Sequence, residues 1–268
     1  MSRQRTVQEC DHAVSALLPE LPRPEQKALA ALVSGVVLEQ DATLSRASTG
    51  IPSDVQDRSK QRRAQRLLAN PRLDVPRAQR RLLARILQGR RGRLDLLLDA
   101  TTTGTTARQA GTVTLVLAVG WQGRALPLVW RTWTADEPGQ DGRGAIPALL
   151  ATVQALLPPG VQVVLLADRG LSGAPLAQAA RAIGWHYLLR AQHQTRFRSP
   201  DGTVRRLGAL APRPGTQRLL TDVALWKKGH SSWATTNRAN VVALWRAADR
   251  EPWLLVTDLP ATLRRCTD

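Results

Sequence analysis

The sequence predicts an α/β protein, a mixed sheet crossed by helices with a basic helical region in front of it. Three observations predict this class. Apolar residues recur at helical spacing up to about residue 93, apolar strands alternate with helices over 94–199, and the helical period vanishes after about residue 200. With 268 residues and 43% hydrophobic content, the chain is long enough to bury a large core.

The charge of the chain favours a polyanionic partner. The formal net charge is +17, and the segment from Arg58 to Arg93 holds 13 basic residues against a single acid, Asp74. A positive field of this size and density favours nucleic acid.

Cysteine usage and hydropathy argue against a disulfide-rich, zinc-binding, secreted or membrane-spanning protein. The two cysteines and four histidines lack the spacing of a disulfide framework or of a zinc site. The N-terminus lacks the apolar core of a secretory signal, and no apolar stretch approaches the roughly 18 residues of a membrane span. We therefore expect a soluble, cytoplasmic protein with no membrane partner.

Residues 1–93 are expected to be helical and basic. Helices are predicted over about 24–37, 57–68 and 77–87, where apolar positions recur at helical spacing between turn signals. Small basic helices of this kind fit a DNA-binding region and equally a basic cap on the next domain. The candidate DNA contacts are Arg62, Arg63, Arg66, Arg80, Arg81 and Arg85.

The middle of the chain alternates between strands and helices. The expected elements are strands at 94–99, 112–119 and 124–133, a helix at 146–157, a strand at 161–168, a helix at 174–183 and a strand at 185–189. This order, β-β-β-α-β-α-β, is that of a ribonuclease H-like core. In that topology the first and fourth strands are neighbours, so Asp99 and Asp168 are expected to lie side by side.

The last part of the chain is predicted to be rich in β-strands. Strands are expected at 203–207, 217–226 and 241–245, separated by loops of glycine, proline and serine. A further strand at 253–256 is expected to return into the main sheet. The predicted organisation is therefore a helical region at 1–93, a ribonuclease H-like core at 94–199, a β-rich insertion at 200–250 and a returning strand within 251–268.

The two strand-terminal aspartates predict a metal site. A single strand that ends in aspartate usually needs no function to explain it. Two carboxylates at neighbouring strand ends, however, make a hard, oxygen-lined site that suits Mg²⁺, and paired Mg²⁺ ions activate both oxygens in a phosphodiester displacement. Arg169 follows Asp168 directly, where it could pair with that carboxylate or reach a phosphate.

Four segments of the sequence resemble one protein family. They are Leu97–Thr102 (LLDATT), Arg124–Trp130 (RALPLVW), Leu166–Gly170 (LADRG) and Glu251–Leu259 (EPWLLVTDL). These segments, with Asn70–Asp74 (NPRLD) before them, resemble successive blocks of the bacterial insertion-sequence DDE transposases. The subgroup is the one with a β-strand insertion domain and a Tyr-Arg-Glu-Lys signature.

This resemblance implies cut-and-paste DNA transposition on a ribonuclease H-like fold. Mg²⁺, for which Mn²⁺ can substitute, would be held by two aspartates and a glutamate and would activate water and then a DNA 3′-hydroxyl. Asp99 and Asp168 match the first two catalytic and metal-binding positions. The implied partner is double-stranded DNA at transposon ends, bound by a homodimer of the complete enzyme at the nucleoid.

The third carboxylate departs from the family pattern. The family's glutamate lies on a helix after the strand that ends in Thr-Asp-Leu, whereas only ten residues follow Asp258 and none is glutamate. The one glutamate after Asp168 is Glu251, which precedes that strand. We therefore expect a C-terminally truncated and inactive transposase. The alternatives are an intact ribonuclease H-like nuclease that uses Asp258 or Glu251, and a non-catalytic DNA-binding inhibitor of transposition.

Overall fold

The computed structural model describes residues 2–104, 111–136, 142–226 and 237–260. The chain forms two compact units, Met1–Arg85 (unit 1) and Ile86–Asp268 (unit 2). The boundary falls inside helix α5 (Val75–Leu87) rather than at residue 93. The last basic residues before the first strand therefore belong to unit 2.

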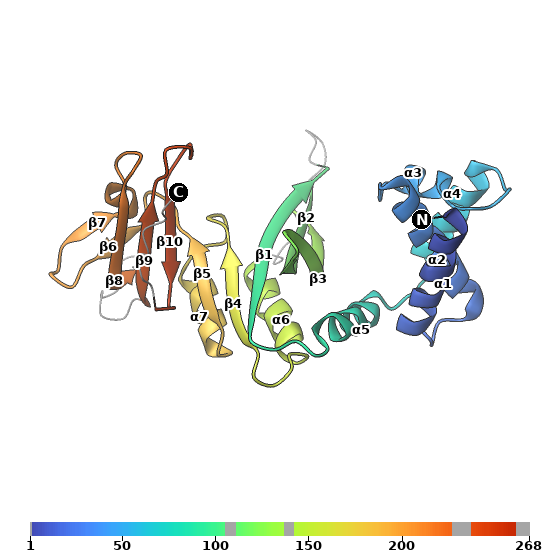
Figure 1. Ribbon diagram of the computed structural model, residues 1–268, viewed down its shortest axis with the longest axis horizontal. Coiled ribbons are helices and arrows are strands. Elements are labelled where there is room, and N and C mark those ends of the chain that lie inside the picture. The colour runs from blue at the N-terminus through green and yellow to red at the C-terminus, as the bar shows by residue number, and fades with distance from the viewer. Residues whose placement is uncertain (1, 105–110, 137–141, 227–236, 261–268) are drawn as a thin grey trace. The chain divides into compact units, whose positions relative to one another are not determined.

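Unit 1 is helical. Its elements are α1 (Arg3–Leu17), α2 (Arg23–Glu39), α3 (Leu44–Thr49), α4 (Asp57–Leu68) and the first part of α5 (Figure 1). Leu32, Ala47, Ala64 and Leu67, from α2, α3 and α4, form a buried apolar cluster. The helices expected at 24–37 and 57–68 are present, while α1 and α3 were not predicted individually.

Close packing in unit 1 depends on a glycine. A Cβ atom built on Gly35 of α2 would lie 2.0 Å from the carbonyl oxygen of Ala47 in α3. Because real Cβ atoms do not approach backbone atoms so closely, only glycine lets these two helices meet at this distance. The α2–α3 contact in turn supports α4, whose Ala64 and Leu67 pack on the same cluster.

Unit 2 is built on one ten-stranded sheet in the order β3-β2-β1-β4-β5-β10-β9-β8-β6-β7 (Figure 1). The strands are β1 (Arg93–Thr103), β2 (Thr112–Trp121), β3 (Arg124–Thr134), β4 (Gln162–Ala167), β5 (His186–Arg190), β6 (Arg196–Arg198), β7 (Val204–Arg206), β8 (Gln217–Leu225), β9 (Asn237–Leu244) and β10 (Trp253–Thr257). Strands β1, β4 and β5 are parallel to one another, and every other pairing is antiparallel. The protein therefore has a mixed α/β fold with a large sheet.

Two helices cover one face of the sheet. Helix α6 (Gly142–Gln154) packs on β2 and β3, α7 (Ala174–Ala182) packs on β5 and β9, and the two helices contact each other. Alternate residues of the central strands, such as Leu96, Leu98 and Leu165, are almost fully buried. This alternation is expected of strands with one packed face.

The predicted β-rich segment continues the same sheet. Strand β10 pairs with β5 on one side and with β9 on the other, so the chain does return into the main sheet at 253–257. Through β9 the pairing extends to β8, β6, β7 and the edge, and a short 3₁₀ turn (Leu207–Leu210) follows β7. Among the described residues, no helix is long and apolar enough to cross a membrane.

Candidate active site

Asp99 and Asp168 lie at the same level on neighbouring strands. The parallel ladder of β1 and β4 ends with the pair Leu98 and Ala167; Asp99 is the next residue of β1, and Asp168 directly follows the last residue of β4. Successive residues of a strand point to opposite faces, so both aspartates lie on the face opposite the buried Leu98. The adjacency predicted from the element order is therefore present.

Asp99 and Asp168 belong to a row of residues that stand at the same level on neighbouring strands, and this row continues on both sides of them. Asp99 pairs with Val116 of β2, which pairs with Trp130 of β3. On the other side, the ladder of β4 and β5 ends with Ala167 and Leu189, so Arg190 stands next to Asp168. Arg190 itself pairs with Leu255 of β10. Two carboxylates and one guanidinium thus stand in a single line across the sheet.

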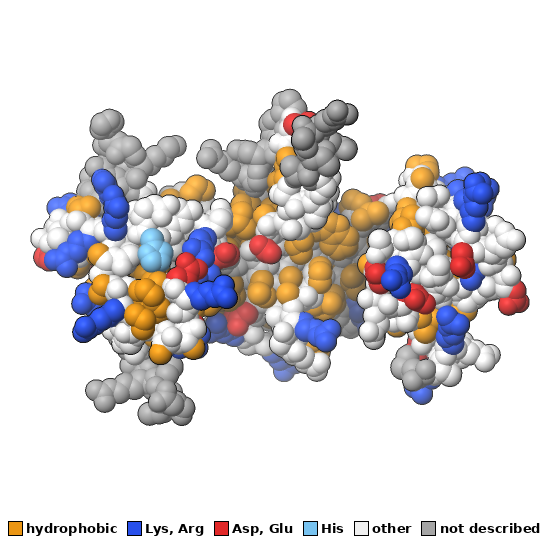
Figure 2. Space-filling model, turned by 90° about the horizontal axis from the view of Figure 1, so that it is seen from above, with side chains coloured by type: hydrophobic (Ala, Val, Ile, Leu, Met, Phe, Trp, Pro, Cys, Tyr) orange, Lys and Arg blue, Asp and Glu red, His pale blue; other side chains and the backbone are white. Residues whose placement is uncertain are grey.

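Beside this row the sheet is apolar. Leu97, Leu166, Leu188 and Leu255 lie on the same face as the aspartates and are only partly buried, unlike their neighbours on the helix-covered face. They line a hollow of about 700 Å³ whose rim includes Asp99, Asp168 and Arg190. Figure 2 shows hydrophobic side chains gathered in a hollow beside acidic ones.

A network of charges adjoins Asp168. Arg190 Nη1 lies 3.6 Å from Asp168 Oδ1, and Arg190 Nη2 donates to Glu251 Oε1 at 2.7 Å. Arg169 binds the same carboxylate through both of its terminal nitrogens, with Nη1 to Oε2 at 3.1 Å. The hydrogen bond from Arg169, with the positive charges of both arginines, lowers the pKa of Glu251. Arg169 therefore pairs with Glu251 and not with Asp168, contrary to one of the two roles considered for it.

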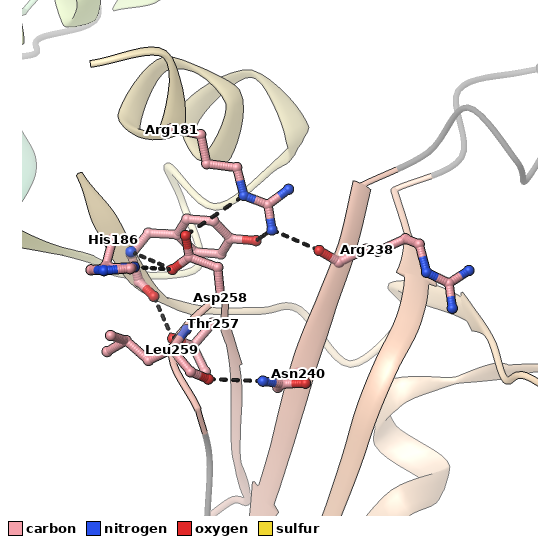
Figure 3. A network of polar contacts seen from close by, with 8 residues as sticks. Arg181, His186, Arg238, Asn240, Thr257, Asp258 and Leu259 are labelled. Carbon is pink, nitrogen blue, oxygen red and sulfur yellow. Dashed lines mark hydrogen bonds and ion pairs between the residues drawn. The ribbon is translucent and has the colours of Figure 1, made fainter. Parts of the chain in front are cut away.

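Asp258 lies at the opposite end of the sheet. Strand β10 is antiparallel to β5, so Trp253 is near the end of β5 and Thr257 near its beginning. Asp258 Oδ1 accepts a hydrogen bond from the Tyr187 backbone N–H at 3.0 Å, and the carboxylate also lies 3.4 Å from His186 and 3.6 Å from Arg181 (Figure 3). The nuclease alternative with Asp258 as third metal ligand is therefore wrong for this geometry.

The residues around Asp258 link three strands by hydrogen bonds at this end of the sheet. Thr257 Oγ1 donates to the carbonyl of Tyr187 at 2.6 Å, and Asn240 Nδ2 donates to the carbonyl of Leu259 at 2.8 Å (Figure 3). Burial raises the pKa of Tyr187 to about 12, an effect that the charge of Asp258 adds to and that of Arg181 opposes. This network joins β10 to β5 and β9, which is a structural role.

Replacing Asp258 by alanine should therefore lower stability and leave metal binding unchanged. The carboxylate is only 15% exposed, and its loss would leave the Tyr187 N–H without its acceptor, at a cost of about 1–3 kcal/mol. All eight tryptophans lie after residue 85, so tryptophan fluorescence in urea reports on unit 2 alone. If Asp258→Ala instead left the unfolding midpoint unchanged and weakened Mn²⁺ binding, Asp258 would be a metal ligand after all.

Glu251 does not complete a metal site with the two aspartates. Two arginines engage its carboxylate, which leaves it neutralised by cations rather than open to another. Among the described residues, no three side chains of His, Cys, Asp or Glu form a group that could hold a metal ion. The row at the end of β1 and β4 thus supplies two carboxylates.

The predicted DNA-contacting arginines fall into two sets. Arg62, Arg63 and Arg66 lie on the exposed side of α4, and none of them pairs with an acidic side chain among the described residues. On α5, Arg81 binds Glu20 at 2.5 Å and also donates to the Leu17 carbonyl. Arg80 of α5 is exposed and Arg85 has a partner within the molecule. Of the six predicted contacts, Arg62, Arg63 and Arg66 of α4 therefore form the largest exposed set without an acidic partner among the described residues.

Sequence reasoning did not single out Arg190. Its strand, like those of Asp99 and Asp168, is a short apolar run that ends in a charged residue, so the same pattern could have found it. The side chain is 19% exposed and its guanidinium stacks over the ring of Trp253 at 4.5 Å. Arg190 is therefore the most firmly held charge of the row.

No family model matches the sequence, and no curated protein matches it. Among solved structures, the chain is similar to an endonuclease V from Bacillus subtilis, with 13% identity and a TM-score of 0.32 over 70% of this chain and 76% of that one. It is also similar to human ENDOV, with 15% identity and a TM-score of 0.30 over 61% of this chain and 68% of that one. Both TM-scores are below 0.5, so the function proposed below rests on the chain's own residues.

Proposed function

We propose that the protein has the ribonuclease H-like core of a DNA-processing enzyme and is related to the bacterial insertion-sequence DDE transposases, with the third catalytic carboxylate missing. The observation that carries this proposal is the placement of Asp99 and Asp168 side by side at the ends of two parallel strands. The order β3-β2-β1-β4-β5, an antiparallel meander followed by parallel strands, supports the ribonuclease H-like assignment.

The donors of the site fit a hard divalent cation. Asp99 and Asp168 offer carboxylate oxygens from adjacent strands, and Mg²⁺ binds in proteins through one or two carboxylates together with water. When bound there, Mg²⁺, or Mn²⁺ in its place, would polarise the oxygens of a phosphodiester displacement. The two aspartates would hold the ion, and Arg190 and Arg169 would supply positive charge next to it.

The remaining parts of the chain would bring DNA to this site. The arginines on α4 form an exposed basic surface in unit 1, which suits the phosphates of a DNA duplex. We propose transposon ends as the DNA and the cytoplasm, at the nucleoid, as the place of action.

A second function, a non-catalytic DNA-binding protein that inhibits transposition, is favoured by one specific observation. The described part of the chain provides two carboxylates at the row, and one of them has the guanidinium of Arg190 at 3.6 Å. Such a protein would bind DNA through α4 and would need no metal ion.

Titration with Mn²⁺, followed by electron paramagnetic resonance, separates the two functions. We expect one Mn²⁺ ion to bind the wild-type chain and its affinity to fall by at least about tenfold in Asp99→Asn and in Asp168→Asn, because each substitution removes a charged ligand. Asp222→Asn is the control, since Asp222 is an exposed carboxylate paired with Arg238 on β8 and β9. Equal Mn²⁺ affinity in all four proteins would contradict the metal site and leave the inhibitor.

A further inference from the structure

The carboxylate of Glu251 is shared by two arginines from different elements. Arg169 lies in the turn after β4, Arg190 ends β5, and Glu251 lies just before β10. Glu251 Oε1 accepts from Arg190 Nη2 at 2.7 Å and also from Arg169 Nη2, and Glu251 Oε2 accepts from Arg169 Nη1 at 3.1 Å. Three N–H groups of two cations therefore converge on one anion.

Arg190 is fixed beside Asp168, while Glu251 and Arg169 remain accessible. The guanidinium of Arg190 is held by the ring of Trp253 at 4.5 Å and by Asp168 at 3.6 Å. The side chains of Glu251 and Arg169 are each 39% exposed, and within the described part of the chain the hydrogen bonds that hold the Glu251 carboxylate all come from the two arginines. Rotation of the Glu251 side chain would release both guanidinium groups from its carboxylate.

A phosphodiester has the same charge and acceptor pattern as this carboxylate. Both carry one negative charge on two equivalent oxygens, and the planar fork of arginine binds carboxylate and phosphate in the same bidentate manner. An arginine pair that is already assembled around a carboxylate is therefore also shaped for a phosphate.

We propose that Glu251 is a built-in competitor that occupies a phosphate-binding site formed by Arg169 and Arg190. A backbone phosphate of DNA would displace the Glu251 carboxylate and bind both guanidinium groups next to Asp168. This inference rests on the proposed function for the identity of the ligand as DNA. It adds a gate to the site, because DNA enters only by breaking an ion pair that the free protein contains.

Glu251→Gln tests the gate because it keeps the shape of the side chain and removes its charge. With EDTA present, so that metal binding plays no part, we expect this variant to bind a short DNA duplex about tenfold more tightly than wild type at about 0.1 M salt. The dependence of log affinity on log salt should steepen by about 0.9, the contribution of one added phosphate contact. Fluorescence anisotropy measures both quantities.

Asp222→Asn is the matched control. It removes one negative charge from another exposed ion pair, Asp222 with Arg238, whose oxygen and nitrogen lie 2.5 Å apart. Because this ion pair is not beside the row, the affinity of the Asp222→Asn variant for DNA should stay within about twofold of wild type. Adding Arg190→Gln to Glu251→Gln should remove the gain, since the freed site would lose one of its two cations.

A second arm uses inorganic pyrophosphate as ligand, measured by calorimetry on the same variants. Tighter pyrophosphate binding in Glu251→Gln than in Asp222→Asn supports the anion site even if no variant binds DNA, an outcome that would refute the proposed function alone. Glu251→Gln that binds DNA and pyrophosphate like Asp222→Asn overturns the inference and leaves the proposed function intact. Weaker binding in Glu251→Gln also overturns it, because Glu251 would then position the arginines rather than compete for them.

Discussion

Replacing Arg58, Arg62 and Arg66 by glutamine will lower the affinity for duplex DNA by about two to three orders of magnitude at about 0.1 M salt. The three residues are four apart along α4, so they lie on one exposed side of the helix. If each neutralises one phosphate, the slope of log affinity against log salt will fall by about 2.7 in all. Glutamine preserves helix propensity, so that charge is the variable.

The control for this prediction is on the next helix. Arg77→Gln with Arg81→Gln removes charge from α5, where both arginines already bind Glu20, at 3.3 and 2.5 Å. We expect a much smaller loss of affinity from this pair. Equal losses per charge on α4 and α5, measured by anisotropy across a salt series, would mean that the whole basic segment acts as a diffuse field and that α4 makes no specific contact.

The contrast between α4 and α5 shows why sequence reasoning separated them poorly. Both helices have a similar density of arginine in the sequence, and both were predicted to contact DNA. What distinguishes them is Glu20, a residue far away in sequence that folding brings to Arg77 and Arg81. Local charge density cannot reveal such neutralisation, because it depends on tertiary contacts.

The central strands were predictable for a physical reason. A strand in the middle of a sheet is typically a short continuous apolar run in the sequence. Two such runs end at Asp99 and Asp168, so the sequence indicates both where these strands lie and where they end. Their adjacency followed from the element order, since a parallel pair joined by a crossover helix places both carboxyl ends at one edge.

The charges around Asp168 could not be predicted in the same way. Glu251 lies 61 residues from Arg190 and 82 from Arg169, and their contact depends on β10 pairing antiparallel with β5. The same pairing moves Asp258 to the far end of the sheet, where it bonds to Tyr187. Sequence reasoning had considered Glu251 and Asp258 together as third ligands. The direction of β10 places Glu251, just before the strand, beside Asp168 and its arginines, and Asp258, just after the strand, at the other end.

The protein is expected to bind DNA without cleaving it in Mg²⁺ or Mn²⁺. The described residues place two carboxylates in the row, and a two-ion mechanism needs ligands that clamp the attacking and the leaving oxygen alike. Arg190, 3.6 Å from Asp168, adds a cation where a second ion would be repelled. Incubation of supercoiled plasmid with the protein and either metal ion should leave the plasmid intact.

An appended helix that carries a glutamate should confer cleavage if the site is of the proposed kind. The partly buried leucines of β1, β4, β5 and β10 form an apolar face beside the row, and a helix packed there would be able to bring a glutamate to Asp99 and Asp168. We therefore expect a chain extended with a helical Tyr-Arg-Glu-Lys segment to nick plasmid DNA with Mg²⁺.

The same extension with glutamine in place of its glutamate is the matched control and should be inactive. Activity should also be lost in Asp99→Asn and Asp168→Asn of the extended chain, because all three carboxylates would hold the ions. Cleavage by the 268-residue chain itself that persists in both of these variants would place the chemistry elsewhere and refute the proposed site.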